Sequence, residues 1–284
     1  KNGPAPESGA LLNYPTPRLL PRNMNVFTAL ADKLFSRKNN FDFSAPLCPL
    51  PKPLDLAQIS RVMVFAPHPD DEAIGCGGLL ALLARQGCKI RVVLVTDGGG
   101  AGGLPASAAR IRQQEFIAAL GILGIDDWRM LGFVDGAVDA DAQLEATLLD
   151  TLTDFMPDTV IMPSMLDLHR DHRAIAVTLA RCSARLQSVR QYIQYEVWCP
   201  LPATHLVDIS AVAETKWTAI EQHQTALKCG DYLTASQGLA RYRGLLLGRP
   251  GTDATAEAFV VETTDVFARQ RQHWLTYTAQ QMLQ

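Results

Sequence analysis

The sequence predicts an α/β fold in which helices cover both faces of a mostly parallel sheet. From residue 58 onward, short apolar runs alternate with longer segments that have the apolar spacing of helices. The apolar runs are continuous, as in strands that are buried on both faces. Two groups of histidines and acids each follow such a run, at the sheet edge where ligands bind. Together these observations indicate a three-layer αβα, Rossmann-like sandwich.

The first half of this region alternates regularly. Residues 61–65 form an apolar run after one charge and predict a buried strand, and glycines open a helix over 73–84. A second strand is expected over 89–96, where apolar residues again run together. Ser107 can cap a helix that runs to Gly121. A short strand over 128–131 follows.

The second half continues the same alternation. Apolar residues at helical spacing predict a helix over 144–156, which Pro157 closes. The apolar run 159–163 predicts a strand, and 174–186 a helix. Further strands are expected at 191–198 and 206–209, followed by a long helix near 211–228.

Composition sets broad limits on the class of protein. The 284 residues are 48% hydrophobic and 19% charged, which supports a folded core and excludes general disorder. The net charge of −3 gives no reason to expect nucleic acid or an anionic membrane as partner. No apolar run reaches the ~18 residues that span a bilayer, and the N-terminus lacks a secretory layout. The six scattered cysteines lack zinc-finger spacing and indicate reduced thiols in a cytoplasmic protein.

Residues 1–57 differ from the rest of the chain. They are rich in proline, and one helical stretch, 25–35, interrupts them. So short and proline-broken a segment cannot build its own core. We therefore expect an N-terminal arm over 1–57 and a single domain over 58–284.

The run Ala66-Pro67-His68-Pro69-Asp70-Asp71-Glu72 lies between a predicted strand and a predicted helix. An imidazole and two adjacent carboxylates there suit a divalent metal. Asp71 could instead only cap the helix, and Asp70 could pair with an arginine. Glu72 is expected only to favour the helix start through the helix dipole.

A second cluster, Asp167-Leu168-His169-Arg170-Asp171-His172, follows the strand 159–163. If both strands belong to one parallel sheet, the two clusters face the same edge and can meet. His169 and His172 are three residues apart, the spacing of one face of a helical turn. Asp171 could fix the tautomer of an imidazole, and Asp167 could cap the turn or contact substrate.

Two imidazoles and one carboxylate leave a coordination position open for water, as in catalytic zinc sites. Iron(II) is the alternative metal for such a donor set. A spare carboxylate can act as general base, and a spare histidine can stabilise an oxyanion or protonate a leaving amine. The sequence has no serine nucleophile elbow, and the glycine-rich 98–103 lacks the Lys-Ser/Thr of a phosphate loop.

The run Val64–Gly78 resembles the signature of the PIG-L/LmbE-like zinc de-N-acetylases. These include relatives that act on N-acetylglucosaminyl-phosphatidylinositol and in mycothiol and bacillithiol synthesis. Further matches, in the family's order over residues 58–262, are Arg112–Glu115, Leu131–Gly136 and Asp167–His172, with weaker ones at Val207–Ser210, Lys216–His223 and Glu257–Phe259.

The resemblance implies a zinc-dependent enzyme that removes the N-acetyl group of an amino sugar or glycoconjugate. It implies one Zn²⁺ held by His68, Asp71 and His172, with Asp70 as general base and His169 polarising the carbonyl or protonating the amine. Substrate contacts would come from Arg112, Asp135 and Asp167. Arg112 could instead form a helix salt bridge, and Asp135 could be a turn residue.

Other functions remain open at this stage. The same site could serve a different zinc hydrolase, acting on a phosphoester or a non-sugar amide. A glycan-binding protein with a vestigial site is a third reading. The expected partner is a small-molecule or glycan substrate, with specificity in loops 97–108 and 133–141, and a homo-oligomer is left open.

Overall fold

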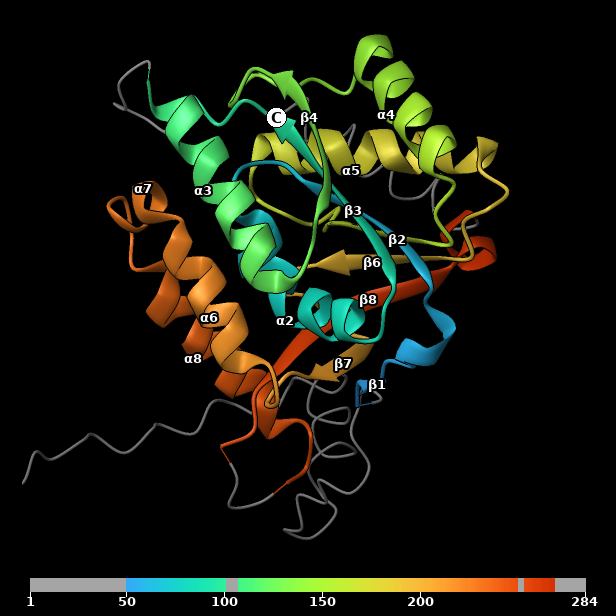
Figure 1. Ribbon diagram of the computed structural model, residues 1–284. Coiled ribbons are helices and arrows are strands. Elements are labelled where there is room, and N and C mark those ends of the chain that lie inside the picture. The colour runs from blue at the N-terminus through green and yellow to red at the C-terminus, as the bar shows by residue number, and fades with distance from the viewer. Residues whose placement is uncertain (1–49, 101–106, 250–252, 269–284) are drawn as a thin grey trace, which may run out of the picture. The chain divides into compact units, whose positions relative to one another are not determined.

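A computed structural model describes residues 50–100, 107–249 and 253–268 (Figure 1). Eight strands form one sheet in the order β1-β7-β8-β6-β5-β2-β3-β4. The strands are β1 Lys52–Pro53, β2 Arg61–Ala66, β3 Lys89–Thr96, β4 Asp127–Phe133, β5 Thr159–Pro163, β6 Gln191–Tyr195, β7 His205–Asp208 and β8 Ala256–Thr263. The helices are α2 Asp71–Arg85, α3 Ala108–Leu123, α4 Ala142–Phe155, α5 Arg170–Cys182, α6 Ala213–Gln222, α7 Gln224–Leu227 and α8 Tyr232–Leu245, with 3₁₀ turns at Leu56–Gln58 and Ser183–Arg185.

The sheet is mostly parallel. Strand β2 pairs in parallel with both β3 and β5, and the parallel pairing continues outward to β4 and β6. Strand β8 is the exception, because it runs antiparallel to both β6 and β7. The predicted mostly parallel α/β sandwich is therefore confirmed.

Helices cover both faces of the sheet (Figure 1). Helices α4 and α5 pack on one face, and α2, α3, α6 and α8 contribute to the core on the other. Side chains of strand β2 point alternately to the two faces of the sheet. Val62 and Val64 pack in the core with α2, α3, α6 and α8, whereas Met63 and Phe65 pack in the core with α4 and α5. The alternation follows from the two-residue period of side chains along a strand.

Helix α2 is kinked at Cys76, whose φ of −148° and ψ of 19° are not helical. The kink breaks helical hydrogen bonds in a buried place, where an unpaired backbone group is costly. Glu257 accepts hydrogen bonds from the backbone amides of residues 78 and 79, at 2.8 and 2.7 Å. Lys216 donates to the carbonyl oxygen of Ile74 at 2.8 Å and to Glu257 at 2.6 Å. This buried ion pair bridges the two halves of the helix.

Several boundaries differ from those predicted. The helix expected near 211–228 is two helices, because His223 has a non-helical ψ of 56° and turns its side chain toward Glu72. Helix α5 begins earlier than expected, with His169 as its N-cap rather than within a helical turn. The strand expected over 191–198 ends at Tyr195.

Helix α8 and strand β8 were not predicted. In the N-terminal segment, β1 pairs with β7. The remainder of the expected arm, including the predicted helix 25–35, lies outside the described residues. Among the residues described, no helix combines the length and the apolar character that crossing a membrane requires.

Candidate metal centre

The two predicted clusters meet because their strands are neighbours. His68 lies just beyond the end of β2, and Asp71 begins α2. His172 lies in the first turn of α5, which follows β5. Since β2 and β5 pair directly and in parallel, both clusters emerge at the same edge of the sheet. The structure thus brings together groups that are about 100 residues apart.

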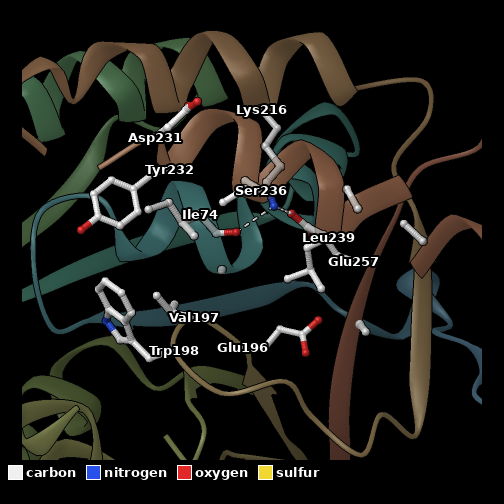
Figure 2. Close-up of a pocket in the computed structure, with 15 residues that line it drawn as sticks. Ile74, Glu196, Val197, Trp198, Lys216, Asp231, Tyr232, Ser236, Leu239 and Glu257 are labelled. Carbon is white, nitrogen blue, oxygen red and sulfur yellow. Dashed lines mark hydrogen bonds and ion pairs between the residues drawn. The ribbon is translucent and has the colours of Figure 1, made fainter. Parts of the chain in front are cut away.

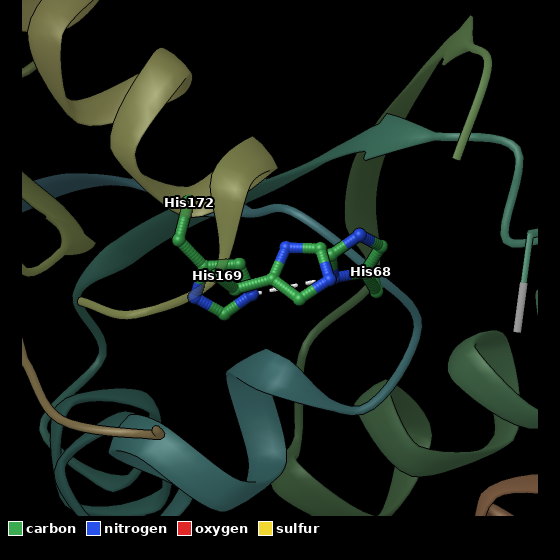
Figure 3. Close-up of side chains that lie close together, drawn as sticks. All are labelled: His68, His169 and His172. Atoms are coloured by element: carbon green, nitrogen blue, oxygen red, sulfur yellow. Dashed lines mark hydrogen bonds between the residues drawn. The ribbon is translucent and has the colours of Figure 1, made fainter. Parts of the chain in front are cut away.

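Three donor atoms form a nearly equilateral triangle. Nδ1 of His68 is 3.2 Å from Oδ2 of Asp71, and Nε2 of His172 is 3.1 Å from the same oxygen. The two histidine nitrogens are 3.2 Å apart (Figure 3). Ligands that surround zinc tetrahedrally at 2.0–2.1 Å lie about 3.3 Å from one another. This buried donor set therefore fits a single small cation.

The outer nitrogens of both histidines face carboxylates. Nε2 of His68 is 3.0 Å from Oδ2 of Asp171 and 3.2 Å from Oδ1 of Asp135. Nδ1 of His172 is 3.2 Å from Oδ2 of Asp167. A carboxylate in this place fixes the tautomer, so that the inner nitrogen presents its lone pair to a metal. Asp171 lies where the sequence led us to expect an orienting carboxylate.

The Asp71 carboxylate is ionised and buried, so the centre needs a positive charge to balance it. Burial raises the pKa of Asp71, but His172 and His68 outweigh burial and hold that pKa well below its ordinary value. Burial lowers the pKa of His172, but Asp71 and Asp167 outweigh it and raise the pKa to about 9. The donor set thus attracts positive charge, which protons supply when no metal is bound and which a metal can replace.

Asp70 is held beside the triangle in an unusual backbone conformation. Its φ of 134° is in a region that non-glycine residues rarely adopt, and its amide donates to Oε2 of Glu72 at 3.2 Å. Its Oδ2 lies 3.4 Å from Arg112. Burial and the neighbouring Asp71 carboxylate raise the pKa of Asp70 to about 7. A carboxylate with such a pKa suits proton transfer near neutral pH.

His169 lies beside His68 and His172, but it is not one of the three residues of the donor triangle. Its ring centroid lies 4.6 Å from that of His68 and 5.0 Å from that of His172 (Figure 3). The backbone amide of Asp171 donates to its Nδ1 at 3.2 Å, so the neutral ring carries its proton on Nε2. Burial and the two other histidines lower its pKa. A neutral ring with a free N–H can donate a hydrogen bond to a reacting group.

Arg112 and Asp135 lie next to the centre rather than away from it. The Arg112 guanidinium is buried and donates to the carbonyl oxygens of Gly98 and Pro69, at 2.8 and 3.2 Å. It is also 3.3 Å from Oδ2 of Asp135. Arg112 therefore links Asp70 to Asp135, the carboxylate that faces His68. Their expected contact with a sugar stays a prediction.

Sequence reasoning missed the partner of Glu72. Oε1 of Glu72 is 3.0 Å from Nε2 of His223, and both side chains are buried. The pair ties the first turn of α2 to the break between α6 and α7. Only the weak motif match over 216–223 marked His223 in the sequence.

Comparisons with known proteins agree with this geometry. The family described as PIG-L, GlcNAc-PI de-N-acetylase, matches residues 63–182. Diacetylchitobiose deacetylase of Thermococcus kodakarensis is 27% identical over 68% of this chain and 81% of its own length. The probable N-acetyl-alpha-D-glucosaminyl L-malate deacetylase 2 of Bacillus subtilis is 28% identical over 58% of this chain and 82% of its own length.

A solved structure is similar over most of its length. The conserved protein TT1542 from Thermus thermophilus superposes with a TM-score of 0.61 at 30% identity. The match covers 70% of this chain and 93% of that protein.

Proposed function

The chain belongs to the PIG-L family, and on that premise we propose that it is a metal-dependent deacetylase that removes the N-acetyl group of an amino sugar or glycoconjugate. The reaction converts an acetamide and water into acetate and a free amine. Relatives named as deacetylases of N-acetylated sugars support this assignment. Phosphoester hydrolysis gains no support from those relatives.

The triangle of His68, Asp71 and His172 carries the proposal. These residues would hold the metal, which we take to be Zn²⁺, with iron(II) as the alternative. Their donor atoms are 3.1 to 3.2 Å apart and all three side chains are buried. No purely structural role calls for two imidazoles and a carboxylate in such close contact.

A bound zinc supplies Lewis acidity, which polarises the amide carbonyl and makes water nucleophilic near pH 7. Asp70 accepts the proton of the attacking water, because its carboxylate lies beside the triangle and is not one of the three donors. Arg112 holds that carboxylate in place. The pKa of about 7 suits the exchange of this proton, although a bound cation lowers it.

His169 faces the reacting amide from the other cluster. Its Nδ1 accepts from the amide of Asp171, so the neutral ring presents Nε2–H as its donor. It stabilises the developing negative charge on the carbonyl oxygen or delivers a proton to the leaving nitrogen. Asp70 and His169 thus divide the proton transfers between them.

The positions of Arg112, Asp135 and Asp167 suggest which of them contact the substrate. We assign the sugar hydroxyls to the side of the centre where Arg112 and Asp135 lie. Asp167 is only 1% exposed and its Oδ2 faces His172, which supports an orienting role more than contact with substrate. Asp171 plays the equivalent part for His68.

The proposed partner is a small-molecule or glycan substrate, and a homo-oligomer remains open. The described cysteines are all free, which is consistent with the cytoplasmic location proposed from the sequence.

The proposal is tested by incubating the purified, zinc-loaded chain with N-acetylglucosamine and N,N′-diacetylchitobiose. Acetate and free amine are measured together, and they should appear in equal amounts. Removal of the metal with a chelator should abolish release, and added Zn²⁺ should restore it. Amine release that is indifferent to chelation would contradict the proposed function.

A further inference from the structure

A cavity of about 280 Å³ lies beside the metal centre and has no role in the chemistry described above. Trp198 and Tyr232 lie on the same side of it, with their rings 5.8 Å apart and nearly perpendicular (Figure 2). Its walls include the apolar side chains of Ile74, Val197 and Leu239. Trp198 is 45% exposed, so the indole offers an open aromatic face.

The buried charged residues that line the cavity are paired, and Asp231, which also lines it, is exposed and caps α8 by accepting a hydrogen bond from the amide of Thr234. Lys216 and Glu257 are paired with each other at 2.6 Å, as the dashed line in Figure 2 marks. Glu196 accepts hydrogen bonds from Arg243 at 2.9 and 2.6 Å. Because both buried pairs are internally compensated, the cavity has no buried charge left to attract a phosphate or a carboxylate. Its chemistry favours an uncharged apolar group.

Two of the residues that line the cavity are neighbours of residues in the metal centre. Ile74 is three residues after Asp71, so the two positions share a face of α2. On the other side, the backbone amide of Trp198 lies 3.4 Å from Oδ2 of Asp167, and the same oxygen faces His172. The cavity therefore lies within reach of a substituent on a sugar held at the metal centre.

We propose that this cavity binds an uncharged alkyl or aryl group carried by the N-acetylated amino sugar. The inference rests on the proposed function and adds the substrate class. The enzyme acts on N-acetylglucosaminides that have an apolar aglycone, in preference to the free or phosphorylated sugar. Burial of the aglycone between Trp198, Tyr232 and the apolar wall provides the selectivity.

The first experiment compares kcat/KM for the methyl, hexyl and 4-nitrophenyl glycosides of N-acetylglucosamine with kcat/KM for N-acetylglucosamine 1-phosphate. The hexyl glycoside should exceed the methyl glycoside by at least about tenfold, because each buried methylene contributes roughly two- to fourfold. The rate with the 4-nitrophenyl glycoside shows whether the cavity accepts an aryl group as well as an alkyl chain. A hexyl-to-methyl ratio near one, or a preference for the phosphate, would overturn the proposal.

Two variants test whether the preference for the hexyl glycoside arises in this cavity. Ala235 is exposed on α8 and lines the cavity, so Ala235→Phe fills it with little risk to folding, and Trp198→Ala removes an aromatic face. Both should bring the hexyl-to-methyl ratio toward one. Tyr242→Ala is the matched control, because Tyr242 is 60% exposed and is not among the residues that line the cavity. An unchanged ratio in both cavity variants would contradict the assignment.

A second measurement does not depend on deacetylation. Octyl glucoside, which lacks an N-acetyl group, is titrated below its micelle concentration into the full chain and followed by calorimetry. Binding should be one to one and at least about tenfold weaker in Ala235→Phe and Trp198→Ala. If octyl glucoside binds as expected but no acetate is released from any N-acetylated glycoside, the proposed function is rejected and the cavity assignment is retained. Absent binding, or binding equal in all variants, would reject the cavity assignment.

Discussion

Nδ1 of His68 and Nε2 of His172 lie 3.2 Å apart, although the two residues are 104 positions apart in the sequence. Direct parallel pairing of β2 with β5 produces this contact, because each histidine follows the end of one of these strands. Two imidazoles at this distance share one ligand or one proton. The metal centre is therefore a property of the folded sheet, and either motif alone is insufficient for it.

The first prediction concerns metal content. His172→Ala removes one corner of the donor triangle and should lower the zinc retained after dialysis from about one per chain to a small fraction. His169→Ala should retain the metal, because Nδ1 of His169 is engaged by the Asp171 amide. Elemental analysis of both proteins at the same pH checks this. Equal zinc loss in both variants would show that His169 is a ligand.

The second prediction separates chemistry from metal binding. Asp70→Asn replaces the carboxylate that is not part of the triangle by a neutral amide of the same shape. Turnover should fall by roughly 10²- to 10⁴-fold while zinc content stays unchanged, because only the proton acceptor is lost. The measurements are kcat for acetate release and elemental analysis. An active Asp70→Asn variant would exclude Asp70 as the general base.

The alternation of strands and helices could be predicted because parallel strands buried on both faces read as continuous apolar runs. Val62 to Phe65 and Val160 to Met162 are such runs, and each ends shortly before a cluster of histidines and acids. The position of both clusters at one sheet edge followed from this pattern. The residues 66–72 and 167–172 therefore carried most of the information about the site.

The features that could not be predicted from the sequence depend on contacts between distant segments. The kink at Cys76 depends on Lys216 and Glu257, which come from distant segments. The break at His223 coincides with its contact to Glu72, another long-range pair. Strand β8 was missed because Glu257 and Glu262 interrupt its apolar pattern, yet both are buried with polar partners. Local periodicity cannot report such pairings.

The third prediction concerns the carboxylate behind His172. Asp167→Asn keeps the shape of the side chain but removes the charge that faces Nδ1. Zinc affinity, measured by competition with a chromogenic chelator, should fall by about 10- to 100-fold. Asp139→Asn is the control, because Asp139 is exposed and pairs with Arg170, which is also exposed. An unaffected zinc affinity in Asp167→Asn would show that this carboxylate does not orient His172.

The fourth prediction concerns the ion pair that bridges α2. Lys216→Met leaves the Glu257 carboxylate buried without its cation and should lower the free energy of unfolding by about 3–5 kcal/mol. Arg170→Met breaks an ion pair of which both side chains are more than half exposed, and should change stability by less than about 1 kcal/mol. Urea unfolding at pH 7 compares the two. Similar losses would mean that the buried pair does not support the kinked helix.

The fifth prediction concerns the pH dependence of stability at Asp158, which joins the start of β2 to β5. Its carboxylate accepts hydrogen bonds from the amide of Arg61 at 3.0 Å and from the hydroxyl of Thr159 at 2.8 Å. Burial raises its pKa, but the hydrogen bonds from Ser60 and these neighbours outweigh burial and lower that pKa below its ordinary value. The ionised form is therefore favoured in the folded state.

A lowered folded pKa stabilises the protein above the unfolded pKa of about 3.9, and the contribution disappears as the pH falls through the folded value. Asp158→Asn should be about 1 kcal/mol less stable than the wild type at pH 7, and the difference should shrink below pH ~4. Asp150→Asn, at an exposed position on α4, should show no such dependence. Urea unfolding at several pH values tests this, and a difference that grows on acidification would mean that the Asp158 carboxylate does not tie β2 to β5.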